Sequence, residues 1–319
     1  MSKTSRRLRI LTWHVHGNYL YYLSHVPHDF YLVTKPGYPA GYAGKGGALP
    51  FGANVHELPA ESVREASFDC VLYQHRRHYD HDRVEILTEA QRALPRVYLE
   101  HDPPLENPYE QPHWAQDAGL VLVHVTFHNQ LMWDNGITPA RVIEHGVVVP
   151  EDARYTGELA RGIVIVNHLV SRGRRLGADV VAALRDDVPL EIIGMEAEAA
   201  GGRGEVPNLD VPYFAARHRF LFSPIRWTSL GLAIVEAMTV GLPAVGVATS
   251  ELASVIRSGH DGFLHNDLPT LREVMRELLA DQGLARTWGQ AARRTALERY
   301  GIERFVADWS RLFAEVTSS

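Results

Sequence analysis

The residues with the clearest potential for chemistry lie between Arg226 and Gly246, in the stretch RWTSLGLAIVEAMTVGLPAVG. Apolar and small residues at helical spacing predict a short helix from about Ser229 to Val240, and the hydroxyl of Thr228 or Ser229 can cap its start. Free N–H groups at the start of a helix that follows a strand attract phosphate. Glu236 lies about two turns into this helix, where its position alone is typical of a solvated glutamate.

The same stretch resembles the signature of retaining glycosyltransferases of family four, which have the GT-B fold. The matching segments are Gly231-Leu232, Glu236-Ala237-Met238 and Gly241-Leu242-Pro243. In that family the second glutamate of the signature holds the nucleotide ribose, so the resemblance implies this role for Glu236. The first glutamate touches the donor sugar, and Thr228 occupies its position here, eight residues before Glu236. The contact to the donor sugar is therefore left open.

Length and composition limit the fold and the partners. A chain of 319 residues exceeds the usual size of a single core, so two domains are expected. A net charge of −6 argues against a nucleic-acid binder. The single cysteine, Cys70, excludes an internal disulfide and favours a reducing cytoplasm. No apolar run approaches the roughly 20 residues that span a membrane.

Strand-like apolar runs alternate with helical patterns in both halves, which predicts an α/β fold with two doubly wound, Rossmann-like domains. The resemblance implies the GT-B arrangement, in which these domains face an interdomain cleft. We expect an acceptor-side domain over 1–155, a donor-binding domain over 156–300 and a terminal helix over 301–319 that packs toward the first domain. The expected strands are 8–13, 30–33, 69–73, 96–99, 120–125, 141–147, 162–166, 190–194, 219–222 and 244–247. The expected helices are 19–24, 82–93, 127–135, 229–240, 250–258, 269–280, 284–300 and 302–316.

The loop after the first strand carries His14, His16 and Gly17. His14 and His16 alternate in an extended segment and should point to opposite sides, so a metal pair is not expected. We assign one of them to the lining of the cleft, because loops at strand ends carry function. Gly17 suits a backbone that approaches a ligand closely.

Residues 36–52 are rich in glycine and proline, and no helical pattern follows, so a phosphate-binding loop is not expected. A mobile loop is the simplest interpretation, and an acceptor-binding lid is the alternative.

Histidines recur at positions 75, 78 and 81. Zinc sites more often use other spacings or cysteines, so we interpret this segment as an exposed histidine-rich turn rather than a metal site.

Glu100-His101-Asp102 follows a strand and precedes two prolines. Burying such a charged triplet is costly unless its groups are paired. It resembles the family segment whose histidine faces the donor sugar, which implies this role for His101. The alternative is a structural cluster in which Asp102 caps local N–H groups.

A basic loop with Arg172, Arg174 and Arg175 follows the first strand of the second half. The corresponding family loop supplies cations to the donor diphosphate, although His168 falls where the family arginine usually lies. Arginine suits this role because its guanidinium forks onto phosphate oxygens. A basic surface turn is the alternative.

These observations predict a retaining, metal-independent glycosyltransferase that uses no cofactor and moves a sugar from a nucleoside diphosphate to an unidentified acceptor hydroxyl. The product would belong to a polysaccharide, glycolipid or other glycoconjugate. N–H groups of Leu230, Gly231 and Leu232, together with Arg172, would stabilise the departing diphosphate. The predicted catalytic residues are His101 and Arg172; the donor-binding residues are Gly17, Arg172, Arg174, Arg175, Thr228, Ser229, Leu230, Gly231, Leu232 and Glu236; the acceptor-side residues are His14, His16 and Asp102.

Two other functions remain open on the same fold, since fold does not fix function. One is an epimerase or phosphorylase. The other is a non-catalytic nucleotide-sugar-binding subunit, which the departures at Thr228 and His168 favour. A further alternative is a peripheral contact with the inner membrane face through Arg6, Arg7 and Arg9, although three basic residues contribute only modest attraction.

Overall fold

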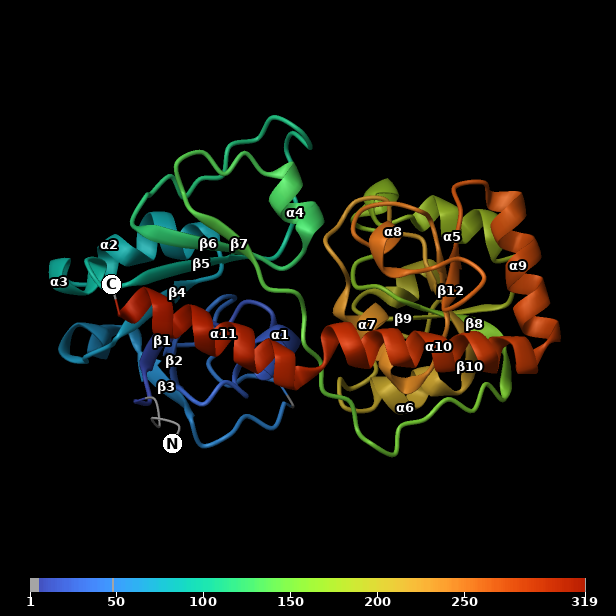
Figure 1. Ribbon diagram of the computed structural model, residues 1–319, viewed down its shortest axis with the longest axis horizontal. Coiled ribbons are helices and arrows are strands. Elements are labelled where there is room, and N and C mark those ends of the chain that lie inside the picture. Colours follow the sequence, from blue (N-terminus) through green and yellow to red (C-terminus); the bar gives the residue numbers. More distant parts are fainter. Residues whose placement is uncertain (1–5, 48, 319) are drawn as a thin grey trace. The chain divides into compact units, whose positions relative to one another are not determined.

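The computed structural model describes residues 6–47 and 49–318 and divides the chain into two compact units (Figure 1). The first unit comprises Met1–Gly146 and Ile302–Ser319, and the second comprises Val147–Gly301. The first unit thus ends at Gly146 rather than at residue 155. The reason lies in the backbone that follows, because Tyr155 N donates to Val240 O at 2.9 Å and Thr156 N donates to Ala216 O at 2.9 Å, both within the second unit.

The first unit is built on a parallel sheet of seven strands in the order β3-β2-β1-β4-β5-β6-β7. Its inner strands are near-continuous apolar runs because helices and loops cover both faces. The carboxyl ends of parallel strands meet at one edge, which gathers the loops after β1, β4 and β5. The strands are β1 (Arg9–Thr12), β2 (Asp29–Thr34), β3 (Val55–Pro59), β4 (Cys70–Tyr73), β5 (Arg96–Glu100), β6 (Leu120–His124) and β7 (Ala140–Val142).

The helices of the first unit are mostly short. They are α1 (Gly17–Leu23), the 3₁₀ turn η1 (Ala60–Glu65), the π-helical turn η2 (His78–Asp82), α2 (Arg83–Glu85), α3 (Glu89–Arg92), α4 (Phe127–Met132) and α11 (Ile302–Thr317). The expectation of one continuous helix over 82–93 was wrong. Thr88 starts a new helix there, because its hydroxyl accepts from Gln91 N at 3.2 Å while Gln91 Oε1 accepts from Thr88 N at 2.9 Å.

Helix α11 supplies a large part of the first unit's aromatic core. Phe305, Trp309 and Phe313 are buried, and Trp309 Nε1 donates to the hydroxyl of Tyr19 on α1 at 3.2 Å. Gly146 lies against this helix so closely that a Cβ there would come within 2.2 Å of Phe305 Cβ. Core packing thus accounts for the aromatic residues of the last helix.

The second unit is built on a parallel sheet of five strands in the order β12-β11-β10-β8-β9. Its strands are β8 (Leu159–Ile165), β9 (Leu190–Ile193), β10 (His218–Ser223), β11 (Ala244–Gly246) and β12 (Gly262–Leu264). Its helices are η3 (Gly173–Arg175), α5 (Ala178–Leu184), η4 (Ala197–Ala200), α6 (Val211–Ala216), α7 (Leu232–Val240), α8 (Leu252–Val255), α9 (Leu268–Ala280) and α10 (Gln282–Tyr300). Among the helices in the described ranges, none combines the length and apolar character needed to cross a bilayer.

Candidate functional site

The loops after β1, β4 and β5 meet at the carboxyl edge of the first sheet through one buried amide, that of Gln74. Its Nε2 donates to Thr12 Oγ1 at 2.9 Å and to the backbone oxygen of Trp13 at 3.0 Å. Its Oε1 lies 3.2 Å from His101 Nε2. Sequence reasoning did not select Gln74, because nothing in its type or spacing shows which side chains it will contact.

His101 sits in an apolar and aromatic environment. Its ring centre lies 4.3 Å from that of His16 and 4.9 Å from that of Tyr19. Burial lowers the pKa of His101 well below its ordinary range, and the nearby His16 and His145 side chains lower it further. The imidazole is therefore neutral at physiological pH and can both donate and accept a hydrogen bond.

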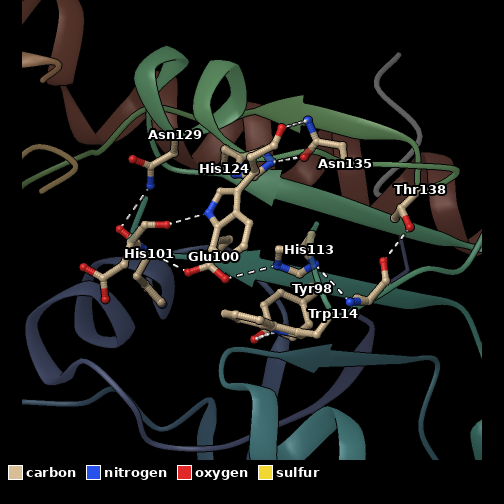
Figure 2. A network of polar contacts seen from close by, with 12 residues as sticks. Tyr98, Glu100, His101, His113, Trp114, His124, Asn129, Asn135 and Thr138 are labelled. Atoms are coloured by element: carbon tan, nitrogen blue, oxygen red, sulfur yellow. Dashed lines mark hydrogen bonds and ion pairs between the residues drawn. The ribbon is translucent and has the colours of Figure 1, made fainter. Parts of the chain in front are cut away.

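Glu100, the residue before His101, forms a buried pair with His113 (Figure 2). Ala115 N donates to His113 Nδ1 at 3.1 Å, so the proton of the neutral ring is on Nε2, which donates to Glu100 Oε2 at 3.1 Å. Glu100 Oε1 accepts from Asp102 N at 3.0 Å. Burial raises the pKa of Glu100 to about 8. The backbone N–H of Asp102 is thus capped by Glu100, a cap that the alternative interpretation of this triplet had assigned to Asp102.

Further hydrogen bonds hold the turn that carries His101 and Asp102. Asn129 Nδ2 donates to the backbone oxygen of His101 at 3.2 Å (Figure 2). Trp133 Nε1 donates to the backbone oxygen of Asp102 at 2.8 Å. Backbone and side chains therefore fix this turn from both sides. Glu100 was part of the sequence triplet but was not singled out there, although a carboxylate at the end of a buried strand is the signal that marks it.

His14 and His16 contact different partners, in agreement with their alternation. His14 Nδ1 lies 2.6 Å from Gly44 O in the glycine-rich loop, whereas His16 lies against His101. A Cβ on Gly17 would lie 3.3 Å from His14 Nε2. The close approach at Gly17 therefore serves the packing of His14 within the protein.

The glycine-rich loop, 36–52, is anchored at its centre; its Ala48 lies outside the described residues. Tyr42 is buried, and its hydroxyl donates to the carboxylate of Asp82. The ammonium of Lys35 lies 4.2 Å from the centre of the Tyr42 ring. These contacts argue against a loop that is detached from the first unit, while a role as an acceptor lid stays a prediction.

The histidine-rich turn is not uniformly exposed, because His78 is buried and stacks on Trp13 with ring centres 4.9 Å apart. Its other members border a pocket of about 580 Å³ lined by His75, Arg76, Arg77, Asp80, His81 and Glu85. Across residues 6–47 and 49–318, no three His, Cys, Asp or Glu side chains are grouped as metal ligands.

In the second unit, α7 begins at Leu232 and its N-cap is Gly231, which makes no side-chain cap hydrogen bond. The expected capping by Thr228 or Ser229 was wrong, because both residues precede the N-cap position. Thr228 N instead donates to Ser250 Oγ at 3.4 Å. The N-cap residue of α7 thus offers no side-chain acceptor to the first N–H groups of the helix.

Glu236 is only 5% exposed, between the buried residues Val235 and Ala237 of α7. This burial excludes the solvated helix glutamate that its position alone would suggest, while the ribose role stays a prediction. A buried carboxylate is costly unless polar groups satisfy it, so the surroundings of Glu236 must be polar at its carboxyl end. Gly241 ends α7 with φ of +95°, the left-handed conformation that favours glycine.

In the basic loop, the three predicted arginines differ in their surroundings. Arg174 Nη1 lies 2.6 Å from Asp179 Oδ2, so this charge is already paired. Arg226, which was not predicted, also binds Asp179 and donates its backbone N–H to Arg175 O at 2.9 Å. Arg172 is exposed at the start of η3. Arg174 and Arg172 are thus both exposed, and they differ in that the Arg174 charge is shared with Asp179.

His168, which occupies the position of the family arginine, has a left-handed backbone with φ of +59°. Its Nδ1 lies 3.2 Å from Glu196 Oε2, which also accepts from Ser171 Oγ at 2.7 Å. These hydrogen bonds lower the pKa of the Glu196 carboxyl. His168 thus organises the loop that carries Arg172.

One segment of the second unit is similar in sequence to known proteins. Residues 203–295, which include the whole of α7, match the family Glycosyl transferases group 1. The chain is 35% identical over 91 residues to exopolysaccharide phosphotransferase SCO2592 of Streptomyces coelicolor, which covers 27% of this chain and 9% of that protein. It is 30% identical over 90 residues to N-acetyl-alpha-D-glucosaminyl L-malate synthase of Bacillus anthracis, which covers 28% of this chain and 24% of that protein. The chain thus matches only a small part of the length of these curated relatives.

Solved structures resemble the chain over nearly its whole length. Sucrose-phosphate synthase from Thermosynechococcus elongatus superposes with a TM-score of 0.68 at 16% identity, over 98% of this chain and 100% of that chain. Anabaena HepE in complex with UDP gives a TM-score of 0.66 at 14% identity, over 97% and 100% of the two chains. This likeness confirms the predicted GT-B fold, and the family match confirms the predicted resemblance to glycosyltransferases.

Proposed function

We propose that this chain, which carries a group 1 glycosyltransferase segment on a GT-B fold, transfers a sugar from a nucleoside-diphosphate donor to an acceptor hydroxyl. The observation that carries the proposal is the pairing, on α7, of a helix start whose N-cap is Gly231 with the buried Glu236. The helix start favours a diphosphate, and a carboxylate accepts hydrogen bonds from ribose hydroxyls. Both features lie inside the matched residues 203–295.

Stabilisation of the leaving group would carry the reaction. N–H groups of Leu230, Gly231 and Leu232, together with the Arg172 guanidinium, would hold the diphosphate as negative charge grows on it. The bond from the anomeric carbon to the phosphate oxygen breaks. The acceptor oxygen then bonds to the same face of that carbon, and its proton passes to the departing phosphate. Retention of configuration and independence of metal are both parts of this proposal.

The first unit would contribute the sugar contacts. We assign His101 to a hydroxyl of the donor sugar, and His16 and Asp102 to the acceptor side. The fixed turn at His101 and Asp102 supports this assignment, because binding groups must be held in place before the substrate arrives. Ligand-facing roles for His14 and Gly17 stay predictions, since their described contacts are with the glycine-rich loop and with each other.

Uridine diphosphate sugars are the donors to test first. HepE was solved with UDP-glucose, and TarM was solved with UDP and alpha-GlcNAc-glycerol. We expect a saccharide, lipid-linked or small-molecule acceptor. A cytoplasmic location, where nucleotide sugars are made, and a peripheral membrane contact through Arg6, Arg7 and Arg9 complete the proposal.

The test is transfer by the full chain from UDP-sugars to a panel of glycosides and polyols, with and without EDTA. We expect UDP release that depends on the acceptor, is unchanged by EDTA, and yields by proton NMR the anomer of the donor. A Glu236→Ala variant provides the control for contaminating activity. UDP bound without turnover on any acceptor would overturn the transferase in favour of a non-catalytic binder. Conversion or phosphorolysis without an acceptor would overturn it in favour of an epimerase or phosphorylase.

A further inference from the structure

The side-chain amide of Gln74 has only one orientation that its surroundings permit. The backbone oxygen of Trp13 can only accept a hydrogen bond, so the Gln74 atom 3.0 Å from it is the NH₂ nitrogen. The hydroxyl of Thr12 accepts the second N–H of the same nitrogen at 2.9 Å. Because both N–H groups are used on β1 and the loop after it, the carbonyl Oε1 of Gln74 is turned toward His101.

This orientation decides where His101 carries its proton. Gln74 Oε1 can only accept, and it lies 3.2 Å from His101 Nε2, so Nε2 must carry the hydrogen. The ring is neutral, so it has no second N–H. The other ring nitrogen, Nδ1, is therefore left with a lone pair and can only accept a hydrogen bond.

The groups around His101 do not reverse this assignment. The titratable side chains that act on the ring are His16 and His145, and both disfavour a charged imidazole. Tyr19 packs edge-on against it and is itself kept protonated, since burial raises the pKa of its hydroxyl. The two oxygens of the adjacent Glu100 carboxyl already accept hydrogen bonds from Asp102 N and His113 Nε2.

We propose that Gln74 is a positioning residue that holds His101 in its Nε2–H tautomer, so that Nδ1 accepts a hydrogen bond from a neutral hydroxyl of the sugar substrate. This inference rests on the proposed function, in which His101 contacts the donor sugar. It also defines a specificity. A lone pair at Nδ1 binds a hydroxyl but repels a carboxylate or phosphate oxygen, so the group at this position is an uncharged sugar hydroxyl rather than an anionic substituent.

The first readout is the tautomer itself, measured without substrate by two-dimensional ¹H–¹⁵N NMR on the ¹⁵N-histidine-labelled full chain. The wild type should show His101 as neutral, with the hydrogen on Nε2, from about pH 5 to 8, the range in which an ordinary histidine changes charge. Assignment comes from the signal lost in a His101→Gln variant. A hydrogen on Nδ1 in the wild type would overturn the proposal.

Two variants of Gln74 change the tautomer in different ways. Gln74→Met keeps a similar shape but removes the acceptor, so the hydrogen should distribute between both ring nitrogens. Gln74→Glu places a carboxylate beside Nε2, which favours the imidazolium, so His101 should titrate within about pH 5 to 8. Thr12→Val is the matched control, because Trp13 O still orients the amide and the tautomer should stay unchanged. An unchanged tautomer in Gln74→Met would contradict the role of Gln74.

The second readout is the kinetics of transfer, compared between intact donors and a series of deoxy-sugar donors. In the wild type, removal of the hydroxyl that meets Nδ1 should reduce kcat/KM by roughly three- to tenfold, the worth of one hydrogen bond. In Gln74→Met, kcat/KM for this deoxy donor should be nearly equal to kcat/KM for the intact donor. In Thr12→Val, the ratio of the two kcat/KM values should be the same as in the wild type. Equal discrimination in all three proteins would overturn the proposal. If the NMR shows the predicted tautomer but no donor is turned over, the proposed function fails while the assignment of Gln74 stands.

Discussion

His113 Nε2 donates at 3.1 Å to Oε2 of Glu100, a buried residue of the first unit that immediately precedes His101 in the chain. The same carboxyl accepts the N–H of Asp102 at 3.0 Å. Glu100 therefore joins a buried histidine to the turn that carries the candidate sugar contact. The cost of burying this carboxyl is offset only because both of its oxygens are hydrogen-bonded.

Glu100 should make the first unit less stable as the pH rises. Burial raises its pKa from 4.5 to about 8. Between these values the folded chain holds a proton that the unfolded chain has lost, so the free energy of unfolding decreases with pH through this window and levels off above about pH 8. His113, whose pKa burial lowers from 6.5 to about 3, acts in the opposite direction below pH 6.5.

A Glu100→Gln variant separates these effects. It removes the titrating carboxyl but keeps His113, so the part of the decrease with pH that Glu100 causes, up to about pH 8, should be absent from the variant. The NH₂ of the new glutamine must also face one of the two N–H donors, Asp102 N or His113 Nε2, and this should lower the free energy of unfolding by about 1–3 kcal/mol. Urea unfolding followed by tryptophan fluorescence measures both, in a Trp227→Phe/Trp288→Phe background that confines the signal to the first unit. A variant with the wild-type pH slope would contradict the raised pKa.

Glu236→Ala should weaken nucleoside-diphosphate binding by roughly ten- to a hundredfold, the worth of hydrogen bonds to a charged group. Isothermal titration calorimetry measures the change. Glu273→Ala, an exposed glutamate of α9, is the matched control and should bind as the wild type does. Equal affinity in Glu236→Ala and the wild type would remove the ribose assignment.

Arg172 and Arg174 should differ in their effect on the donor diphosphate. Arg172→Ala removes an exposed guanidinium and should weaken binding by at least about tenfold. Arg174→Ala removes a charge already paired with Asp179, and should change the affinity less than about fivefold. Competition by UDP against a fluorescent nucleotide measures both. The opposite order would show that Arg174 exchanges Asp179 for the ligand.

Trp309→Ala should destabilise the first unit by about 3–5 kcal/mol, because it removes a fully buried aromatic side chain from α11. Trp309→Phe keeps most of the ring and loses the hydrogen bond to Tyr19, so it should cost less, with about 1 kcal/mol from that bond. Circular dichroism during urea unfolding measures both. A mild effect of Trp309→Ala would mean that α11 contributes little to this core.

The sequence contains strong signals for the fold but weak ones for the site. Apolar runs predicted most strands, because parallel strands are buried on both faces. The edge strand β3 was missed, since VHELP is short, alternates with charge and ends in proline. The single helix over 82–93 was wrong because apolar periodicity cannot reveal the π-helical turn or the capping box at Thr88.

The motif around Glu236 was visible in the sequence, but its local geometry was not. Hydroxyls near a predicted helix start suggested a cap, whereas the helix begins after Gly231 and buries Glu236. Gln74 and His113 act through contacts between loops that are distant in the chain, 27 and 13 residues from their partners His101 and Glu100. No spacing rule connects such positions, so only the folded structure brings them together.

Whether the chain binds a nucleoside-diphosphate donor is tested most directly by thermal unfolding. The ligands are a panel of uridine, guanosine, adenosine and thymidine diphosphates and their sugars. A ligand that binds only the folded chain raises the free energy of unfolding, by about 2.7 kcal/mol at a ligand concentration of one hundred times Kd, and so raises the midpoint temperature. We predict that the nucleotides of one base raise the midpoint in the wild type and in Glu273→Ala, and fail to do so at the same concentration in Glu236→Ala. A panel in which no nucleotide raises the midpoint of the wild type would contradict a nucleoside-diphosphate-sugar transferase.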